Sequence, residues 1–210
     1  MKNSKPLKKI LAVSLIMILT LCTLTACGGN DANTNSQGDE MTTLVLGTSA
    51  DYAPFEFMYP DENGEMVFGG IDVDTAQYIA DYMGEELQVE NMSFSNLLTA
   101  LGKGQFDIVL ADIEATDERK EAVDFSEPYY EAVQYVLLPE GSEIATAEDL
   151  KNKTIGVQLG TTGDFIASDI EGTTVNTYNK GVDAVNDLIN GRVDCVIIDK
   201  NPALVFESKF

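Results

Sequence analysis

The chain has 210 residues, with 13 lysines and arginines against 35 aspartates and glutamates, a net charge of −22 and no histidine. The lack of histidine excludes histidine-based catalytic triads, histidine general bases and histidine metal ligands. The negative charge disfavours binding to nucleic acids and to anionic lipid surfaces. The same charge favours solubility and tolerates a cationic ligand, without by itself requiring one.

The first 26 residues have the pattern of a bacterial lipoprotein signal peptide. Four lysines precede a mostly apolar run over residues 10–24, and Leu24-Thr-Ala-Cys27 follows directly. This tetrapeptide resembles a lipobox, which implies cleavage before Cys27 and lipidation of its thiol. The alternative is an uncleaved signal anchor, but the apolar run is short for a membrane span. Two or more acyl chains would hold the protein firmly on a membrane.

Residues 27–40 are small and polar and have no apolar periodicity, which predicts a flexible tether. Loss of the leader removes four of the 13 basic residues, so 9 face 35 acidic ones and the net charge becomes −26. Because Cys22 leaves with the leader and Cys27 carries lipid, Cys195 has no disulfide partner in the mature chain. Its apolar surroundings in residues 194–198 predict a small buried hydrophobic residue.

From residue 41 onward, short apolar runs alternate with amphipathic segments, which predicts parallel sheets of the α/β class. Asp61-Glu-Asn-Gly64 predicts a hairpin turn between two apolar runs. The predicted strands are 43–48, 87–90, 106–110, 134–139, 154–158, 173–178 and 194–199. The predicted helices are 72–83, 93–101, one starting at 116, 147–151, 160–167, 182–190 and one capped by Asn201 ahead of Pro202.

In open α/β sheets, ligands bind beyond the carboxyl ends of the strands. The polar loops expected there are 49–55, 111–119, 159–163 and 199–201. Two of these loops, at Thr116 and Thr161, also begin helices. The free N–H groups of such helix starts favour an anionic group in the cleft.

Arg119 is the residue that departs most clearly from local rules within the segment 106–130. Thr116 is a good N-cap, and Asp117 and Glu118 suit the first turn of a helix. Arg119 does not, because a cation there opposes the helix dipole. Its planar fork, beside free helix N–H groups, predicts a site for a carboxylate or a phosphate. The alternative is an ordinary surface ion pair with one of the many acidic residues.

Six motifs follow one another along residues 42–210. They are Gly47-Thr-Ser-Ala-Asp-Tyr-Ala-Pro-Phe-Glu-Phe57, Gly70-Ile-Asp-Val-Asp74, Thr116-Asp-Glu-Arg119, Val123-Asp-Phe-Ser126 with Pro128-Tyr-Tyr130, Gly160-Thr-Thr162, and Gly191-Arg-Val-Asp194 ahead of Asp199. In order and spacing they resemble the bacterial extracellular solute-binding proteins of family 3, which deliver polar amino acids to ABC transporters. The resemblance implies a periplasmic-binding-protein-like α/β fold, with lobes at 41–131 and 132–210 joined by a hinge.

The resemblance also implies how the main chain of an amino acid is held. Arg119 would bind the ligand's α-carboxylate, helped by backbone N–H groups near Glu114 and Thr162. Asp199 would receive the α-ammonium group. The alternative for Asp199 is a bond to the backbone of the turn before Pro202.

Tyr52 and Phe94 would wall the ligand's side chain, and Gln158 would lie at the edge of the pocket. The alternative is that both rings are ordinary core aromatics. Gly160-Thr-Thr-Gly163 lacks the lysine of a phosphate-binding P-loop. We expect no catalytic residue, no metal and no cofactor.

Two positions depart from the family pattern, which usually has small or hydroxyl residues where this chain has Asp112 and Glu114. If Glu114 faces the pocket together with Asp199, the two carboxylates stay ionised cheaply only with a cation between them. This favours a basic amino acid. Against it, Ser49 stands where several binders of basic amino acids have an acid. The family also continues beyond Phe210, so the resemblance implies an incomplete second lobe, with Pro128-Tyr-Tyr130 as the first hinge crossing.

We therefore expect a monomeric, lipid-anchored binding protein on the extracytoplasmic face of a bacterial membrane. It would capture a polar, and on the argument above basic, amino acid by lobe closure and deliver it to a transporter permease. Two alternatives stay open. One is a dehydratase-like enzyme for small carboxylates, with Glu114 as general acid or base. The other is a ligand-sensing domain of a receptor.

Overall fold

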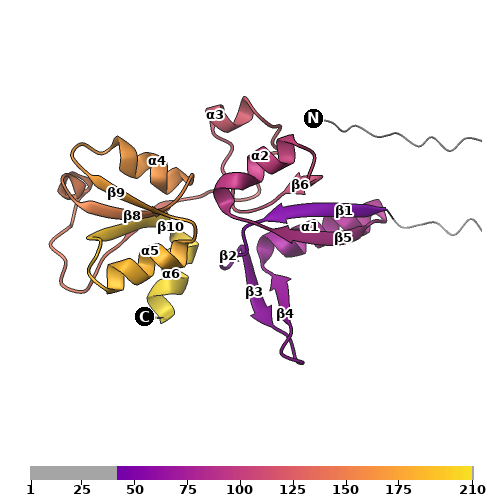
Figure 1. Cartoon of the computed structure of the whole chain (residues 1–210), viewed down its shortest axis with the longest axis horizontal. Coiled ribbons are helices and arrows are strands. Elements are labelled where there is room, and N and C mark those ends of the chain that lie inside the picture. Colours follow the sequence, from indigo (N-terminus) through magenta and orange to yellow (C-terminus); the bar gives the residue numbers. More distant parts are fainter. Residues whose placement is uncertain (1–41, 210) are drawn as a thin grey trace, which may run out of the picture. The chain divides into compact units, whose positions relative to one another are not determined.

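The structure is a computed structural model that describes residues 42–209. The predicted leader, the predicted lipidation at Cys27 and the predicted tether lie outside the described residues. Residues 42–209 fold into three sheets (Figure 1). We call residues 43–120 the β1 half and residues 134–209 the β10 half, after the central strand of each.

The β1 half has a parallel sheet in the order β5-β1-β6. Successive strand residues face opposite sides of a sheet, so β1 contacts a different helix on each face. Leu46 packs with Ala76 of one helix, while Val45 packs in the cluster that holds Leu97 of the other. The elements are β1 (Thr43–Thr48), α1 (Ile71–Met83), β5 (Glu86–Asn91), the 3₁₀ turn η1 (Phe94–Asn96), α2 (Leu97–Gly102), β6 (Ile108–Val109) and α3 (Asp117–Lys120).

A three-stranded antiparallel sheet of β2 (Asp51–Tyr52), β3 (Glu56–Pro60) and β4 (Met66–Gly69) projects from the β1 half (Figure 1). Its turn is the predicted one, since the Asp61 carboxylate accepts from the backbone N–H of Asn63 and of Glu65, each at 2.8 Å.

Gly70 connects this sheet to α1. Its φ is 119°, and a Cβ there would lie 2.2 Å from the backbone oxygen of Phe55. Only glycine fits this close approach of two backbone segments. The Asp72 N–H donates to that same oxygen at 2.9 Å. This bond fixes the start of α1 against Phe55, the neighbour of Glu56.

The β10 half has a sheet in the order β7-β10-β8-β9, with β7 antiparallel to its neighbour and the other pairs parallel. Figure 1 shows α4 on one face of this sheet and α5 on the other. Cys195 and Ile197 accordingly face the α4 side, and Val196 and Ile198 the α5 side. The elements are β7 (Gln134–Leu137), η2 (Ala147–Leu150), β8 (Thr154–Gln158), α4 (Thr162–Asp169), β9 (Thr174–Tyr178), α5 (Gly181–Ile189), β10 (Cys195–Asp199) and α6 (Lys200–Lys209).

In each half, an aspartate just before one parallel strand makes the same pair of hydrogen bonds to the neighbouring strand. Asp107, before β6, donates its N–H to the Val45 oxygen and accepts the Val45 N–H on its carboxylate, both at 2.9 Å. Asp194, before β10, makes the same pair of bonds with Thr154, at 2.8 and 2.7 Å. Each aspartate therefore aligns a parallel strand with its neighbour. The Asp194 of the Gly191-Arg-Val-Asp194 motif is thus a structural residue.

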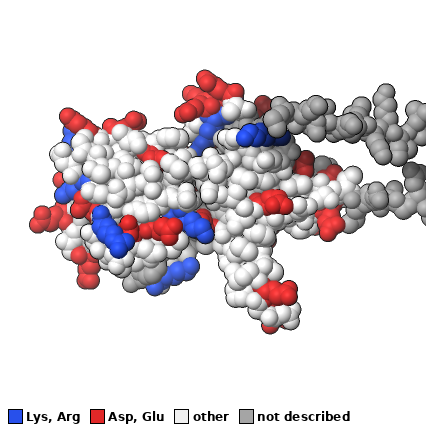
Figure 2. All heavy atoms as spheres, in the orientation of Figure 1, with Lys and Arg blue, Asp and Glu red and all other residues white. Residues whose placement is uncertain are grey.

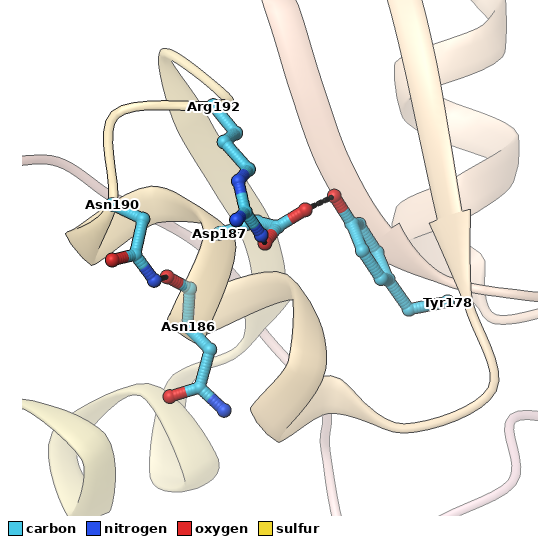
Figure 3. A network of polar contacts seen from close by, with 5 residues as sticks. All are labelled: Tyr178, Asn186, Asp187, Asn190 and Arg192. Atoms are coloured by element: carbon cyan, nitrogen blue, oxygen red, sulfur yellow. Dashed lines mark hydrogen bonds and ion pairs between the residues drawn. The ribbon is translucent and has the colours of Figure 1, made fainter.

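Arg192 of the same motif is structural as well (Figure 3). The Asp187 carboxylate accepts from the Tyr178 hydroxyl on one oxygen and from Arg192 Nη1 on the other, each at 2.7 Å. This network ties the end of β9 to α5 and to the turn after it. It lies outside the set of residues predicted to bind a ligand.

The predicted alternation of strands and helices is confirmed, and β8 has its predicted bounds. The helix predicted to start at Thr116 is present as a single turn, Asp117–Lys120. Two other predictions were wrong. Strand β6 covers only Ile108–Val109, not residues 106–110. The last helix begins at Lys200, so Asn201 is not its N-cap. The Asn201 side chain instead donates to the Tyr130 hydroxyl at 3.0 Å.

Acidic side chains form several separate groups on the described surface (Figure 2). Figure 2 shows two groups of them, at α3, which carries Asp117 and Glu118, and at the tip of the β3–β4 hairpin. Within residues 42–209, no helix is both long enough and apolar enough to cross a membrane. The fully buried Cys195 is a free thiol, as predicted.

Candidate functional site

One small pocket is lined by all nine residues predicted to bind the ligand, and they come from both halves of the chain. Its volume is about 10 Å³, roughly enough to hold one water molecule. The predicted residues that line it are Ser49, Tyr52, Phe94, Asp112, Glu114, Arg119, Gln158, Thr162 and Asp199, and the remaining lining residues are Glu56, Ala111 and Thr161.

Arg119 is buried, with 8% of its surface exposed. Its Nη1 donates to the Glu114 backbone oxygen at 2.8 Å, and its Nη2 donates to the Gly160 backbone oxygen at 2.9 Å. The guanidinium carbon lies 5.5 Å from the ring centre of Phe94 and 5.9 Å from that of Phe165. Among the described residues Arg119 forms no ion pair, so the alternative of a surface ion pair is wrong. Burial lowers the pKa of Arg119.

The helix that begins after Thr116 is too short for its dipole to explain the position of Arg119. Thr116 is the N-cap as predicted, because its hydroxyl accepts from the Arg119 N–H at 3.2 Å. The helix is only four residues long, so Arg119 lies in its last turn as well as in its first. A one-turn helix has a small dipole. The position of Arg119 is explained by its contacts, which reach from the β1 half to Gly160 in the β10 half.

Asp199 lies at the carboxyl end of β10, and both of its oxygens have partners. Oδ2 accepts from the Tyr52 hydroxyl and Oδ1 from Gln134 Nε2, each at 2.7 Å. The Tyr52 hydroxyl also accepts from the Asp199 N–H at 3.2 Å. The two side-chain oxygens of Asp199 therefore bond the side chains of Tyr52 and Gln134, and neither bonds the backbone of the turn before Pro202. Burial raises its pKa, while the bonds from Tyr52 and Gln134 lower it.

Tyr52 combines the two roles that the sequence left open. Its ring belongs to the hydrophobic core that also holds Phe55, Ile198 and Phe206, and its hydroxyl reaches the pocket. This core includes residues of both halves. The ring packing therefore holds the hydroxyl in place against Asp199.

Glu114 and Thr162 meet across the pocket, where the Thr162 hydroxyl donates to Glu114 Oε2. The two residues come from opposite halves, the loop after β6 and the first turn of α4. Thr161 caps α4, since its hydroxyl accepts from the Asp164 N–H at 3.3 Å. Gln158 Nε2 donates to the backbone oxygen of Asn179 at 3.2 Å. The Glu114 carboxylate thus has a partner within the protein.

Asp112 is held in an uncommon conformation, with φ at 45°. Its N–H donates to Asp72 Oδ2 at 2.7 Å, while its own Oδ2 is buried without a hydrogen-bond partner. Burial, followed by the charges of Asp199, Asp72 and Glu114, raises the pKa of Asp112 from 3.8 to about 8. Asp112 therefore keeps its proton near neutral pH.

Sequence reasoning missed two acidic residues beside Asp112. Glu56 lines the pocket with 1% of its surface exposed; no N–H or hydroxyl group of the described residues donates to it, and its carboxyl group is hydrogen-bonded to that of Asp72. Asp72 lies behind it, fully buried, and accepts from the Tyr129 hydroxyl at 3.0 Å. Both stand in motifs that carry the family resemblance. The available signal was an acid between two phenylalanines, Phe55 and Phe57, at the start of a strand.

A second, larger hollow of about 950 Å³ is lined mainly by α1, α2, the loop after β6 and residues 120–132. It shares Asp112 and Glu114 with the small pocket but contains neither Arg119 nor Asp199. The small pocket is therefore the one in which a buried cation and a buried carboxylate face the same space.

Comparison with known proteins identifies the family. The family described as bacterial extracellular solute-binding proteins, family 3, matches residues 44–200, which run from β1 into the start of α6. The chain belongs to this family. The resemblance seen in its motifs is thus confirmed, together with the periplasmic-binding-protein-like α/β fold.

Individual relatives of this family-3 chain are binding proteins for amino acids. It is 36% identical over 191 residues to the arginine-binding extracellular protein ArtP of Bacillus subtilis, which covers 88% of this chain and 72% of ArtP. It is 34% identical over 168 residues to the L-cystine-binding protein TcyJ of Escherichia coli K12, covering 79% of this chain and 62% of TcyJ.

Solved structures of similar proteins have the same fold. The substrate-binding protein of an amino acid ABC transporter superposes with a TM-score of 0.76 at 39% identity, covering 78% of this chain and 73% of that one. The arginine-bound form of truncated ArgBP from T. maritima superposes with a TM-score of 0.73 at 41% identity, covering 80% and 78%.

Proposed function

We propose that this chain is the extracytoplasmic binding component of an ABC transporter for amino acids. It captures a polar amino acid between its two halves and presents it to the membrane permease. The observation that carries the proposal is the buried guanidinium of Arg119, which among the described residues faces the pocket without a carboxylate partner. A buried arginine fork binds a carboxylate through two parallel, charge-assisted hydrogen bonds.

The main chain of the ligand has a partner for each charged group. Arg119 binds the α-carboxylate, and the Thr162 hydroxyl lies beside it at the first turn of α4. Asp199 accepts the α-ammonium group, with Tyr52 holding its carboxylate in place. Phe94 walls the ligand's side chain, and Ser49 and Gln158 complete the lining. The proposal is supported by the arginine-bound relatives, whose fold matches over 80% of this chain.

Capture requires the two halves to separate and close again. The pocket, at about 10 Å³, is far smaller than an amino acid, while Arg119–Gly160 and Thr162–Glu114 bonds connect its two sides. We assign the lobes to residues 41–131 and 132–210, with the crossing at Pro128-Tyr-Tyr130. Closure about such a hinge buries the ligand and creates the shape that a permease recognises.

The chain is further proposed to be a monomer anchored to the outer face of the bacterial membrane through lipid on Cys27. The support is the leader pattern ahead of this cysteine and the polar segment that follows it. The family is one of extracellular solute-binding proteins, which agrees with this location.

We propose a binding protein rather than an enzyme. One solved relative is the ancestral amino acid-binding protein AncCDT-1, a precursor of cyclohexadienyl dehydratase, at 35% identity and a TM-score of 0.71. In this chain the candidate acid or base Glu114 is engaged by Thr162 across the pocket. A bound amino acid followed by NMR should therefore stay chemically unchanged.

The decisive experiment is calorimetric titration with the common L-amino acids, ornithine and citrulline. At least one should bind, and Arg119→Ala should weaken that binding by about 3 kcal/mol, or about 150-fold, because it leaves the ligand carboxylate buried and unpaired. Arg192→Ala is the matched control, since Arg192 is exposed and paired with Asp187 outside the pocket. Equal affinity of Arg119→Ala and the wild type would contradict the proposal.

A further inference from the structure

Glu56 and Asp72 form a pair of acids that the proposed ligand contacts do not use. Both are buried, with 1% and 0% of their surface exposed, and their carboxyl groups are hydrogen-bonded to each other. Two adjacent buried charges of the same sign are costly, so two carboxyl groups in contact share a proton. The pair therefore carries one proton near neutral pH.

The hydrogen-bond donors around the pair place that proton on Glu56. Asp72 Oδ2 accepts the Asp112 N–H at 2.7 Å, and Asp72 Oδ1 accepts the Tyr129 hydroxyl at 3.0 Å. No N–H or hydroxyl group of the described residues donates to Glu56. A carboxylate only accepts hydrogen bonds, whereas a protonated carboxyl group also donates one. Asp72 is therefore the carboxylate, and Glu56 is the acid that donates to it.

The surroundings of the pair keep the proton on Glu56. Burial raises the pKa of Glu56 well above its usual value, and the charges of Asp72 and Asp112 raise it further. Asp51 of β2 also faces Glu56 and acts in the same direction. Burial raises the pKa of Asp72 as well, but the bonds that it accepts from Asp112, Tyr129 and Glu56 lower it. Within residues 42–209 neither acid of the pair has an ion-pair partner.

The same Asp72 carboxylate connects the pocket to the proposed hinge crossing. Asp112 lines the pocket, whereas Tyr129 lies in the middle of the crossing. Tyr130, the next residue, reaches the β10 half, since its hydroxyl accepts from Asn201 Nδ2 at 3.0 Å. The hydroxyls of two neighbouring tyrosines thus bond opposite halves, and Asp72 is the partner in the β1 half.

We propose that Asp72 is a positioning residue for ligand capture, which holds Tyr129 of the crossing and Asp112 of the pocket through one carboxylate. Glu56 supplies the proton that this carboxylate needs beside it. The inference rests on the proposed function and concerns how the halves close. A crossing fixed at Tyr129 keeps its order while they open and close. A crossing released from Asp72 has to be ordered again at each closure, which costs conformational entropy and weakens ligand binding.

The test uses the amide analogues of the two acids, because an amide can replace a protonated carboxyl group as a donor but cannot replace a carboxylate. Asp72→Asn loses an acceptor, and Tyr129→Phe loses the hydroxyl that Asp72 holds. Each should weaken ligand binding about tenfold, the cost of ordering one backbone residue. Glu56→Gln keeps a donor for Asp72, so its loss of affinity should be at least about threefold smaller than that of Asp72→Asn. The probe in calorimetry is L-arginine, or the common L-amino acid that binds more tightly in the titration described above.

Infrared spectroscopy of the ligand-free protein near pH 7 locates the proton independently of any ligand. The absorption of protonated carboxyl groups should be weaker in Glu56→Gln than in the wild type. Glu62→Gln, at the exposed tip of the same hairpin, is the matched control and should leave this absorption unchanged. Equal absorption in Glu56→Gln and the wild type would overturn the assignment of the proton to Glu56.

Matched controls for the binding measurements lie on the same helix as Asp72. Asp74→Asn and Tyr82→Phe are both at exposed positions of α1 and should leave the affinity unchanged. If Asp72→Asn does not fold, Tyr129→Phe carries the test, since it removes a single hydroxyl. Wild-type affinity in Tyr129→Phe, or a loss in Glu56→Gln as large as in Asp72→Asn, would overturn this inference alone. A wild type that binds no amino acid would overturn the proposed function with it.

Discussion

Asp112 is a single pocket residue whose conformation and burial both destabilise the folded chain. Its positive φ and its unpartnered buried oxygen are both unfavourable for the folded chain. The folded state lowers the cost by keeping the carboxyl protonated, with its pKa at about 8 instead of 3.8. A site that is unfavourable in this way gains most from a ligand that supplies the missing charge.

This leads to a prediction for stability without ligand. Because the pKa of Asp112 is raised on folding, the folded chain binds more protons than the unfolded chain between about pH 4 and pH 8. Asp112 therefore makes the free energy of unfolding fall as pH rises through this window, by up to about 1.4 kcal/mol per pH unit. Asp112→Asn should remove that contribution, and urea denaturation at a series of pH values measures it. A constant difference between variant and wild type would contradict the prediction.

At the scale of elements, both halves use the same glycine–aspartate connection between a helix and a parallel strand. A glycine with positive φ, Gly104 or Gly191, ends the connection after a helix, and an aspartate three residues later begins the strand. That aspartate bonds both backbone groups of one residue in the neighbouring parallel strand. This bond pair sets the register of the strand whose far end carries site residues, Asp112 after β6 and Asp199 in β10.

Removing the Asp194 carboxylate, which bonds β8 in the β10 half, should destabilise the fold. Asp194→Ala leaves the Thr154 N–H without its 2.7 Å acceptor and should lower the free energy of unfolding by about 0.5–1.5 kcal/mol, the usual net contribution of one hydrogen bond. Asp169→Ala, an exposed aspartate at the end of α4, is the control and should change it by less than about 0.5 kcal/mol. Chemical denaturation of both variants measures the difference. A similar loss in both would show that Asp194 has no special role.

For the whole molecule, the site exists only where the halves meet. Tyr52 and Asp199 are 147 residues apart in the sequence, and Arg119 reaches Gly160 across the same boundary. The core that holds Tyr52 and Phe55 also contains Phe206. Stability, pocket volume and ligand contacts are thus coupled through the same interface.

Closure can be followed directly by energy transfer between two dyes, attached through the substitutions Tyr82→Cys and Glu140→Cys at exposed positions. Cys22 and Cys27 are replaced by serine in the same protein so that they take no dye. Cys195 should stay unlabelled, since it is fully buried and burial raises its pKa to about 11. The energy transfer between the dyes should change on adding the bound amino acid and should saturate with the affinity found by calorimetry. Transfer that is insensitive to a saturating ligand would argue against lobe closure.

Sequence alone determined much of the architecture, because the features concerned are local. Apolar runs and periodicity placed the strands and helices, turn chemistry placed the hairpin at Asp61–Gly64, and hydroxyl residues marked the caps at Thr116 and Thr161. The family resemblance, together with the two departures from it at Asp112 and Glu114, then supplied nine predicted residues, all of which line one cavity. Periodicity and capping depend only on neighbours in the chain, so they can be read without a structure.

Only the tertiary structure decided which acidic residues are buried in the pocket and which of them are hydrogen-bonded. Glu56 and Asp72 look like ordinary strand and helix residues in the sequence, but packing removes both from water and places their carboxyl groups in contact. Glu114, which the sequence favoured, is engaged by a threonine 48 residues away. Burial and hydrogen-bond partners depend on contacts between distant segments, and these contacts set the charge state of a carboxylate. They are therefore what only the folded chain could decide.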